Sequence, residues 1–205
     1  MRWFRGVEIA LFVIGFSLLG GATAAVVRSQ VYQARQGRAF PDPERREVAS
    51  SRAESPSRPS EPASPRTAAA SPDADPLVLG RIEIPRIGIS AIVREGVDDA
   101  TLAVAVGHVP GTALPGERGN MALAGHRDSF FRALRHIRVD DTIRFRSSES
   151  RYDYRVDSTE VVGPNETRVL HATGGPVLTL VTCYPFGYVG PAPDRFVVRA
   201  YRLAP

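Results

Sequence analysis

Between residues 77 and 205, apolar and polar positions alternate with a period close to two, the pattern of half-buried β-strands. Short stretches at 98–102, 129–137 and 165–171 have the spacing of helical turns instead. About eight short strands with little helix predict a mainly β domain that closes, or nearly closes, into a small barrel. The clearest strands are expected at 80–84, 88–93, 121–125, 142–146, 152–162, 177–182 and 196–203.

The N-terminal segment has a different pattern. Residues 9–27 carry no charge, and a stretch of this length can span a hydrocarbon core of about 30 Å. Two arginines among the first five residues favour a single-pass helix with its N-terminus inside the cell. A cleaved signal peptide is the alternative, because residues 22–24 read Ala-Thr-Ala. The apolar stretch is longer than a usual signal, so we expect an uncleaved membrane anchor at 1–29, with its transmembrane helix at about 7–27.

Residues 30–76 have the composition of a disordered linker. Eight prolines lie between Pro41 and Pro76, mixed with Ser, Ala, Glu and Arg, and no apolar periodicity is present. Such a segment cannot bury enough apolar surface to fold. We interpret it as a tether that lets a membrane-anchored domain, residues 77–205, reach its substrates.

The composition excludes several kinds of site. All 26 basic residues are arginines, and residues 77–205 hold 16 of them against 14 acidic residues. The domain is therefore close to neutral, without the basic patch that a nucleic-acid partner requires. A single cysteine excludes an intrachain disulfide and a cysteine-rich zinc site. We expect no metal and no organic cofactor.

The lone cysteine, Cys183, directly follows the strand expected at 177–182 and precedes a long loop rich in proline, glycine and aromatic residues. Arg195 ends that loop, and His126 follows a second short apolar strand. A cysteine, a histidine and an arginine at strand ends suit a nucleophile, an acid/base group and a cationic stabiliser. The competing interpretation makes Cys183 a small buried hydrophobe. The length and aromatic content of the loop favour a functional site.

Residues 179–183, Thr-Leu-Val-Thr-Cys, with Arg195 twelve positions on, resemble the T-L-x-T-C…R signature of sortases. Residues 107–116 and 124–132 resemble the histidine region of the class D branch. The resemblance covers about 77–203. It implies an eight-stranded sortase-like β-barrel and the activity of a membrane-anchored cysteine transpeptidase.

By this resemblance, Cys183 attacks the carbonyl after Thr in a C-terminal sorting signal similar to L-P-x-T-G, forming a thioacyl-enzyme. His126 is expected to protonate the leaving amine and then to deprotonate the incoming one. Arg195 is expected to hold the substrate and stabilise the oxyanion. Thr182 is expected to shape the site beside the nucleophile. Roles at the substrate or in packing around the site stay open for His108, Tyr184 and Phe186.

The implied partners are exported proteins that bear a sorting signal, and an amine acceptor: a peptidoglycan stem, a pilin lysine or another amine. The catalytic domain is expected outside the cytoplasmic membrane. Since the chain has no lysine, no lysine of its own can intercept the acyl group. Two other functions stay open: a cysteine peptidase or hydrolase with the same site, and a non-catalytic exported binding module. Arg127 and Asp128 are expected to form a local cap or ion pair.

Overall fold

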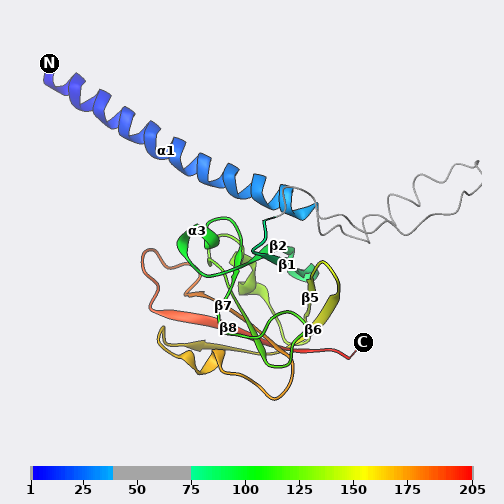
Figure 1. Cartoon of the computed structure of the whole chain (residues 1–205). Coiled ribbons are helices and arrows are strands. Elements are labelled where there is room, and N and C mark those ends of the chain that lie inside the picture. Colours follow the sequence, from blue (N-terminus) through cyan, green and yellow to red (C-terminus); the bar gives the residue numbers. More distant parts are fainter. Residues whose placement is uncertain (1, 39–74, 205) are drawn as a thin grey trace, which may run out of the picture.

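Eight β-strands pair side by side between residues 78 and 202, and the sheet closes on itself (Figure 1). The strands are β1 (Val78–Ile84), β2 (Ile89–Glu95), β3 (Val106–His108), β4 (Asn120–Ala124), β5 (Thr142–Arg146), β6 (Arg151–Val162), β7 (Val177–Tyr184) and β8 (Asp194–Arg202). Their order around the barrel is β1-β2-β3-β4-β7-β8-β6-β5. This computed structural model describes residues 2–38 and 75–204. The predicted mainly β fold with eight strands is confirmed.

The pairing of β4 with β7 brings distant parts of the chain together. These two strands run parallel, from Asn120 opposite Val177 to Ala124 opposite Val181. The carboxyl ends of parallel neighbours lie at the same edge of a sheet, so the segment after β4 meets the end of β7. Strand β8 is antiparallel to β7 and begins where β7 ends.

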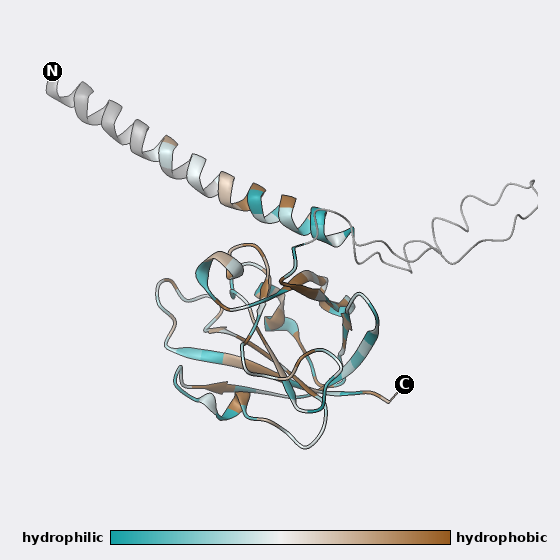
Figure 2. Cartoon of the chain, viewed as in Figure 1, coloured by the Kyte–Doolittle hydropathy of each residue, from teal (hydrophilic) through white to brown (hydrophobic). Residues whose placement is uncertain are grey.

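Apolar side chains from the strands fill the inside of the barrel. On β7, Leu178 and Leu180 are fully buried, opposite Ala200 and Val198 of β8. Burying one large apolar side chain stabilises the fold by about 1.5–3 kcal/mol. Figure 2 shows the apolar stretches running along the strands. Because side chains alternate along a strand, the odd-numbered residues of β7, such as Thr179 between Leu178 and Leu180, face outward.

Short helical segments connect the strands: η1 (Pro85–Ile87), α3 (Asp99–Leu102), η2 (Arg132–His136) and η3 (Thr167–Leu170). The last three lie where the sequence predicted helical turns, whereas η1 was not predicted. Asp98 caps α3 because its Oδ1 accepts a hydrogen bond of 3.0 Å from the Thr101 amide.

The barrel differs from the prediction in two places near the site. Strand β3 was not predicted, because it has three residues and its central Gly107 gives no strand signal. A Cβ on Gly107 would lie 2.3 Å from the carbonyl oxygen of Gly96, so the close approach of the two backbones requires glycine. Strand β7 continues past the predicted end at 182, and Cys183 lies inside it.

Helix α1 (Arg2–Gly37) ends beside the barrel, next to β2 (Figure 1). It continues eight residues beyond 29, into the segment that was predicted as linker. Among residues 2–38 and 75–204, no helix has both the length and the apolar character required to cross a bilayer.

The last turns of α1 are hydrogen bonded to the barrel. The Gln33 side chain accepts a hydrogen bond from the Ile92 amide and donates one to the Val104 carbonyl, both 2.8 Å long. These two bonds join the helix to β2 and to the segment before β3.

The end of α1 also holds Asp75, the residue within the predicted linker at which the described structure resumes. Tyr32 donates a 2.9 Å hydrogen bond to Asp75, and Gln36 accepts one of 3.4 Å from the Asp75 amide. Residues 39–74 of the predicted linker lie outside the described residues, but their flanking residues lie side by side. The two hydrogen bonds hold Asp75 at the end of α1, and the predicted role of the linker as a tether stays a prediction.

Candidate functional site

Cys183 lies on β7 with its backbone directly opposite Arg195 of β8. Both side chains are half-buried. Inward positions on β7 alternate with outward ones, and Cys183 shares the outward parity of Val181, whose partner on β8 is Val197. Cys183 and Arg195 therefore face the same side of the sheet, the outer surface of the barrel.

His126 comes to the same surface from β4. The last ladder pair of the two parallel strands is Ala124 opposite Val181, and the Gly125 amide still donates a 3.2 Å hydrogen bond to the Val181 carbonyl. His126 follows two residues after the last paired residue of β4, at the same edge of the sheet as Cys183. The imidazole side chain is exposed. Cys183 thus lies on the middle strand of three, with Arg195 on β8 and His126 just beyond the end of β4.

Buried contacts on both sides of Gly125 fix the start of the histidine segment. The Thr182 hydroxyl donates a 2.7 Å hydrogen bond to the Gly125 carbonyl, and Thr182 is only 2% exposed. A Cβ on Gly125 would lie 2.8 Å from the ring of Phe131, so the ring packs directly on this glycine. The Phe131 amide in turn donates a 3.1 Å hydrogen bond to the His126 carbonyl. Thr182, beside Cys183 on β7, therefore contacts the backbone that leads into His126.

The other threonine of the Thr-Leu-Val-Thr-Cys segment also binds β4. Thr179 is fully buried and donates a 2.7 Å hydrogen bond to the Asn120 side chain. The Asn120 amide group donates to the carbonyls of Val169 and His171, at 2.9 and 3.3 Å. This network holds η3 and the β6–β7 connection against the outer face of the sheet.

Apolar contacts hold that connection on the same face. Val169 of η3 packs with Val162 and Val197, and Val181 packs against this cluster. The connection therefore forms one side of the outer surface on which Cys183 lies. A cavity of about 270 Å³ opens where β4 begins, between Asn120 and Leu170.

Arg195 directs part of its guanidinium group toward its own loop. Nη1 donates hydrogen bonds to the carbonyls of Asp194 and Ala192, at 2.9 and 3.3 Å. Within the described residues, Nε and Nη2 make no hydrogen bond, so these donors are available to a bound oxyanion.

Aromatic rings gather beside Cys183 and Arg195. Tyr184 stacks on Phe196 with ring centroids 6.2 Å apart, and Phe186 meets both rings edge-on at 6.0 and 5.4 Å. Phe186 and Phe196 also pack against the main core. The packing role that was left open for Tyr184 and Phe186 is present, and the half-buried rings also border the site.

Arg127 has a role that the sequence did not reveal. Its Nη2 donates 2.8 Å hydrogen bonds to the carbonyls of Tyr188 and Gly190, and its guanidinium carbon lies 6.0 Å from the centre of the Tyr188 ring. The residue after His126 thus holds the β7–β8 loop, which connects Cys183 to Arg195. A local cap or ion pair was expected instead. No sequence signal marks this role, because the acceptors are backbone carbonyls more than 60 residues away.

His108 does not contact the outer surface, and a role in substrate binding is not supported. The side chain is 1% exposed, and its Nδ1 lies 2.7 Å from the Glu95 carboxylate. Its Nε2 lies 3.0 Å from the Ala113 carbonyl. On β3, His108 lies between Glu95 of β2 and Leu123 of β4, with which it pairs. His108 stabilises the contact between β2 and the β3–β4 loop.

Within the described residues, no group of three or more His, Cys, Asp or Glu side chains is arranged to hold a metal ion. The site consists of Cys183, His126 and Arg195 and of the groups that position them. These three side chains suit nucleophilic catalysis at a carbonyl carbon.

The profile of the Sortase domain family matches residues 82–203. The chain is 35% identical over 127 residues to Sortase D of Bacillus subtilis (strain 168), a match that covers 60% of this chain. The match covers 63% of that relative, so the chain spans less than two thirds of its length.

Solved sortase structures have the same barrel. Sortase C-1 from Actinomyces oris is 34% identical with a TM-score of 0.58, covering 64% of this chain and 76% of that one. Sortase A from Corynebacterium diphtheriae is 31% identical with a TM-score of 0.59, covering 64% and 63%. The Sortase D5 transpeptidase of Clostridium perfringens, at 23% identity and a TM-score of 0.62, is similar in fold and covers 87% and 99%. Since the family profile spans nearly the whole barrel and more than half of the sequence, this chain belongs to the sortase family.

Proposed function

We propose that this chain is a membrane-anchored cysteine transpeptidase that cleaves a sorting signal similar to L-P-x-T-G after Thr and transfers the acyl group to an amine. The observation that carries the proposal is the position of Cys183 on the middle one of three neighbouring strands. His126 follows the strand on one side, and Arg195 pairs with Cys183 on the other. Cys183 and Arg195 face the same side of the sheet and His126 follows β4 at the same edge, which supports a single site for an extended peptide.

In the first half of the reaction, the Cys183 thiolate attacks the carbonyl carbon of the Thr–Gly bond. A sulfur–carbon bond forms, and the carbonyl oxygen becomes an oxyanion that the unused donors of Arg195 stabilise. The carbon–nitrogen bond then breaks as the His126 imidazolium gives its proton to the leaving amine. The products are a thioacyl-enzyme and the released C-terminal segment.

In the second half, the acceptor amine attacks the thioester carbon. Neutral His126 takes a proton from this amine, and the carbon–sulfur bond breaks to restore the Cys183 thiolate. The acceptor is a peptidoglycan stem amine, a pilin lysine or another exported amine. No lysine of this chain competes with it.

The membrane anchor in this proposal rests on the sequence. Residues 9–27 are uncharged and follow two arginines, which favours a cytoplasmic N-terminus and an extracytoplasmic barrel. Exported proteins with a sorting signal would then reach the enzyme on the outer side of the cytoplasmic membrane.

The test uses the full chain in detergent micelles, incubated with a pool of peptides resembling L-P-x-T-G and L-A-x-T-G. Intact mass spectrometry is expected to detect an adduct equal to the peptide cut after Thr, and the Cys183→Ala variant is expected to form none. Adding candidate amines is expected to replace the adduct with a ligated peptide. His126→Ala is expected to slow turnover by about 10²–10⁴-fold.

Other outcomes assign other functions. Released acid in the presence of every amine would identify a cysteine peptidase. No adduct, together with slow alkylation of Cys183 in a folded chain, would identify a binding module.

A further inference from the structure

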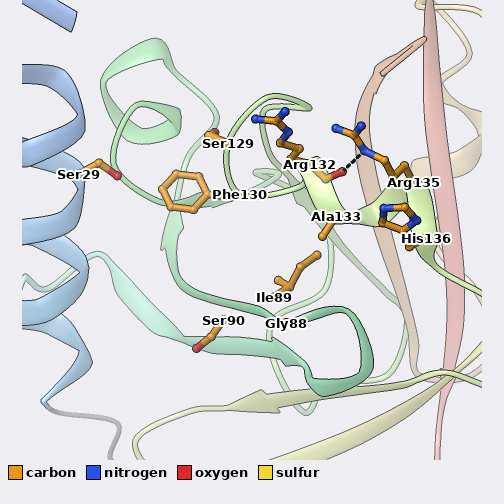
Figure 3. A pocket seen from close by; sticks show the side chains of 10 residues that line it. All are labelled: Ser29, Gly88, Ile89, Ser90, Ser129, Phe130, Arg132, Ala133, Arg135 and His136. Atoms are coloured by element: carbon orange, nitrogen blue, oxygen red, sulfur yellow. Dashed lines mark hydrogen bonds between the residues drawn. The ribbon is translucent and has the colours of Figure 1, made fainter. Parts of the chain in front are cut away.

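A cavity of about 580 Å³ lies between the C-terminal half of α1 and the barrel (Figure 3). Its walls come from three places: Ser29 on α1, the β1–β2 turn with Gly88 to Ser90, and the segment 129–136 around η2. The volume is within the range of small-molecule sites. Cys183, His126 and Arg195 do not line it, so this cavity is separate from the proposed catalytic site.

The lining of the cavity is cationic on one side. Figure 3 shows Arg132, Arg135 and His136 together along η2, with Ser29 on the opposite wall. None of the lining residues is acidic. Within the described residues, the guanidinium group of Arg132 has no hydrogen bond or ion pair. The only hydrogen bond of the Arg135 side chain there is the 3.0 Å bond from Nε to the Arg132 carbonyl, and its guanidinium carbon lies 5.8 Å from the centre of the Phe186 ring. Several N–H donors are therefore left for an anion.

The remaining lining suits a molecule that has both a polar and an apolar part. Ser29, Ser90 and Ser129 add hydroxyl groups, and the Ser90 oxygen already accepts a 2.8 Å hydrogen bond from Arg81. Between these groups lie the apolar side chains of Ile89 and Phe130. A negatively charged group with several oxygen acceptors, attached to an apolar body, matches this combination.

The position of Ser29 along α1 indicates where such a molecule comes from. Ser29 is two residues after Val27, the last residue of the uncharged segment, which is about 3 Å along a helix axis. The headgroup region on each side of a bilayer is roughly 5–7 Å thick. If residues 9–27 cross the membrane, as the proposed function states, the α1 wall of the cavity lies at the depth of the phospholipid headgroups.

We propose that this cavity binds the phosphate headgroup of an anionic phospholipid from the membrane that α1 enters. Arg132 and Arg135 bind the phosphate oxygens as charge-assisted donors, and the serine hydroxyls bind the polar part of the headgroup. Ile89 and Phe130 contact the beginning of the acyl chains. The bound lipid thereby holds the barrel against the membrane surface. This attachment adds to the Gln33 hydrogen bonds, which hold the barrel to α1.

Native mass spectrometry of the full chain in detergent micelles tests this proposal. Phosphatidylglycerol is titrated in, with phosphatidylcholine as the neutral lipid for comparison. We expect a one-to-one complex with selective retention of phosphatidylglycerol. The double variant Arg132→Gln/Arg135→Gln is expected to weaken binding by about 30-fold, from roughly fivefold for each arginine near an anionic headgroup.

Two variants make the result specific to the cavity. Arg155→Gln/Arg199→Gln removes the same charge from β6 and β8 and is expected to leave binding unchanged. Ser29→Phe fills the cavity from α1 without changing the charge and is expected to weaken binding, even if the double variant does not fold. Equal retention of both lipids, or equal weakening in the β6/β8 variant, would overturn the proposal.

Two further measurements are needed: one identifies the source of the anion, and the other tests the membrane anchor independently of the cavity. Competition by soluble glycerol phosphate at the affinity of the lipid would show a site for a phosphate from solution and would overturn the lipid assignment. Flotation with purely neutral vesicles tests the anchor without the cavity. A chain that floats with neutral vesicles but shows no selectivity for phosphatidylglycerol in the titration would refute only the cavity proposal. Failure to float would refute the anchor and, with it, the headgroup depth on which the lipid assignment rests.

Discussion

The hydrogen bond from Thr182 to the Gly125 carbonyl offers a direct test of how the site is positioned. Thr182→Val removes the hydroxyl and keeps the shape of the side chain. The donor residue and the carbonyl are both buried, and the bond is 2.7 Å long. The variant therefore leaves a buried acceptor without a partner, which costs about 1–3 kcal/mol of unfolding free energy. A domain with an ordinary stability of about 5–15 kcal/mol stays folded after that loss.

The effect on catalysis follows from the next residue. Gly125 directly precedes His126, so a displaced Gly125 carbonyl displaces the backbone that carries the imidazole. A shift of about 1 Å in a catalytic group costs on the order of 10²-fold in rate. We expect Thr182→Val to slow formation of the thioacyl-enzyme by about 10–100-fold, with little change in KM.

Thr182→Ser is the matched control, because it keeps the hydroxyl and loses one methyl group, a cost of about 0.8 kcal/mol. The assay combines single-turnover mass spectrometry of the adduct with urea unfolding of the same preparations. The serine variant is expected to react at a rate close to that of the native chain. A valine variant with the native rate would refute the positioning role. Equal slowing in both variants would assign the effect to packing.

The remaining predictions concern groups around the site and the barrel edge. Arg127→Lys loses the paired hydrogen bonds to Tyr188 and Gly190, so we expect faster amide exchange in the β7–β8 loop and a raised KM, whereas Arg155→Gln changes neither. Gln33→Ala removes both hydrogen bonds of Gln33 to the barrel, and hydrogen exchange at Ile92 is expected to become faster while the melting temperature of the barrel changes little. Asp141 accepts hydrogen bonds from Arg86, which lower the pKa of this carboxyl below its ordinary 3.8. Its contribution to stability is therefore present above pH 3.8 and lost as the pH falls further. Urea midpoints between pH 6 and pH 2.5 should fall less steeply in Asp141→Asn, and an unchanged slope would contradict this reasoning.

The strands and the chemistry-bearing residues were predictable because they carry local signals. The alternation of apolar and polar residues along 142–146 predicted β5 with the same first and last residues that the structure has. The lone cysteine in a Thr-Leu-Val-Thr-Cys segment marked the candidate nucleophile. Which neighbours Cys183 has depends on the parallel pairing of β4 with β7, and strand periodicity contains no information about pairing partners. The sequence resemblance supplied that information.

Other features were not predictable because their partners are far away in the sequence. Gln33 looks like an ordinary polar residue near the end of a helix, and its role depends on backbone groups of Ile92 and Val104. The histidine of a Gly/Pro-rich segment looked like a candidate for the site, but the pairing of β3 with β2 places His108 opposite Glu95. In each case a long-range contact, rather than local preference, decides the role.

The contacts of Asp75 with Tyr32 and Gln36 change what the length of the intervening segment can control. Since the two ends are held together, adding or removing residues between them leaves the distance from the barrel to the helix unchanged. The closure entropy of such a loop grows by only about 0.6 kcal/mol for each doubling of its length. Under the proposed function, the length of a sorted protein's own C-terminal region, and not the length of residues 39–74, therefore sets whether its signal reaches the site.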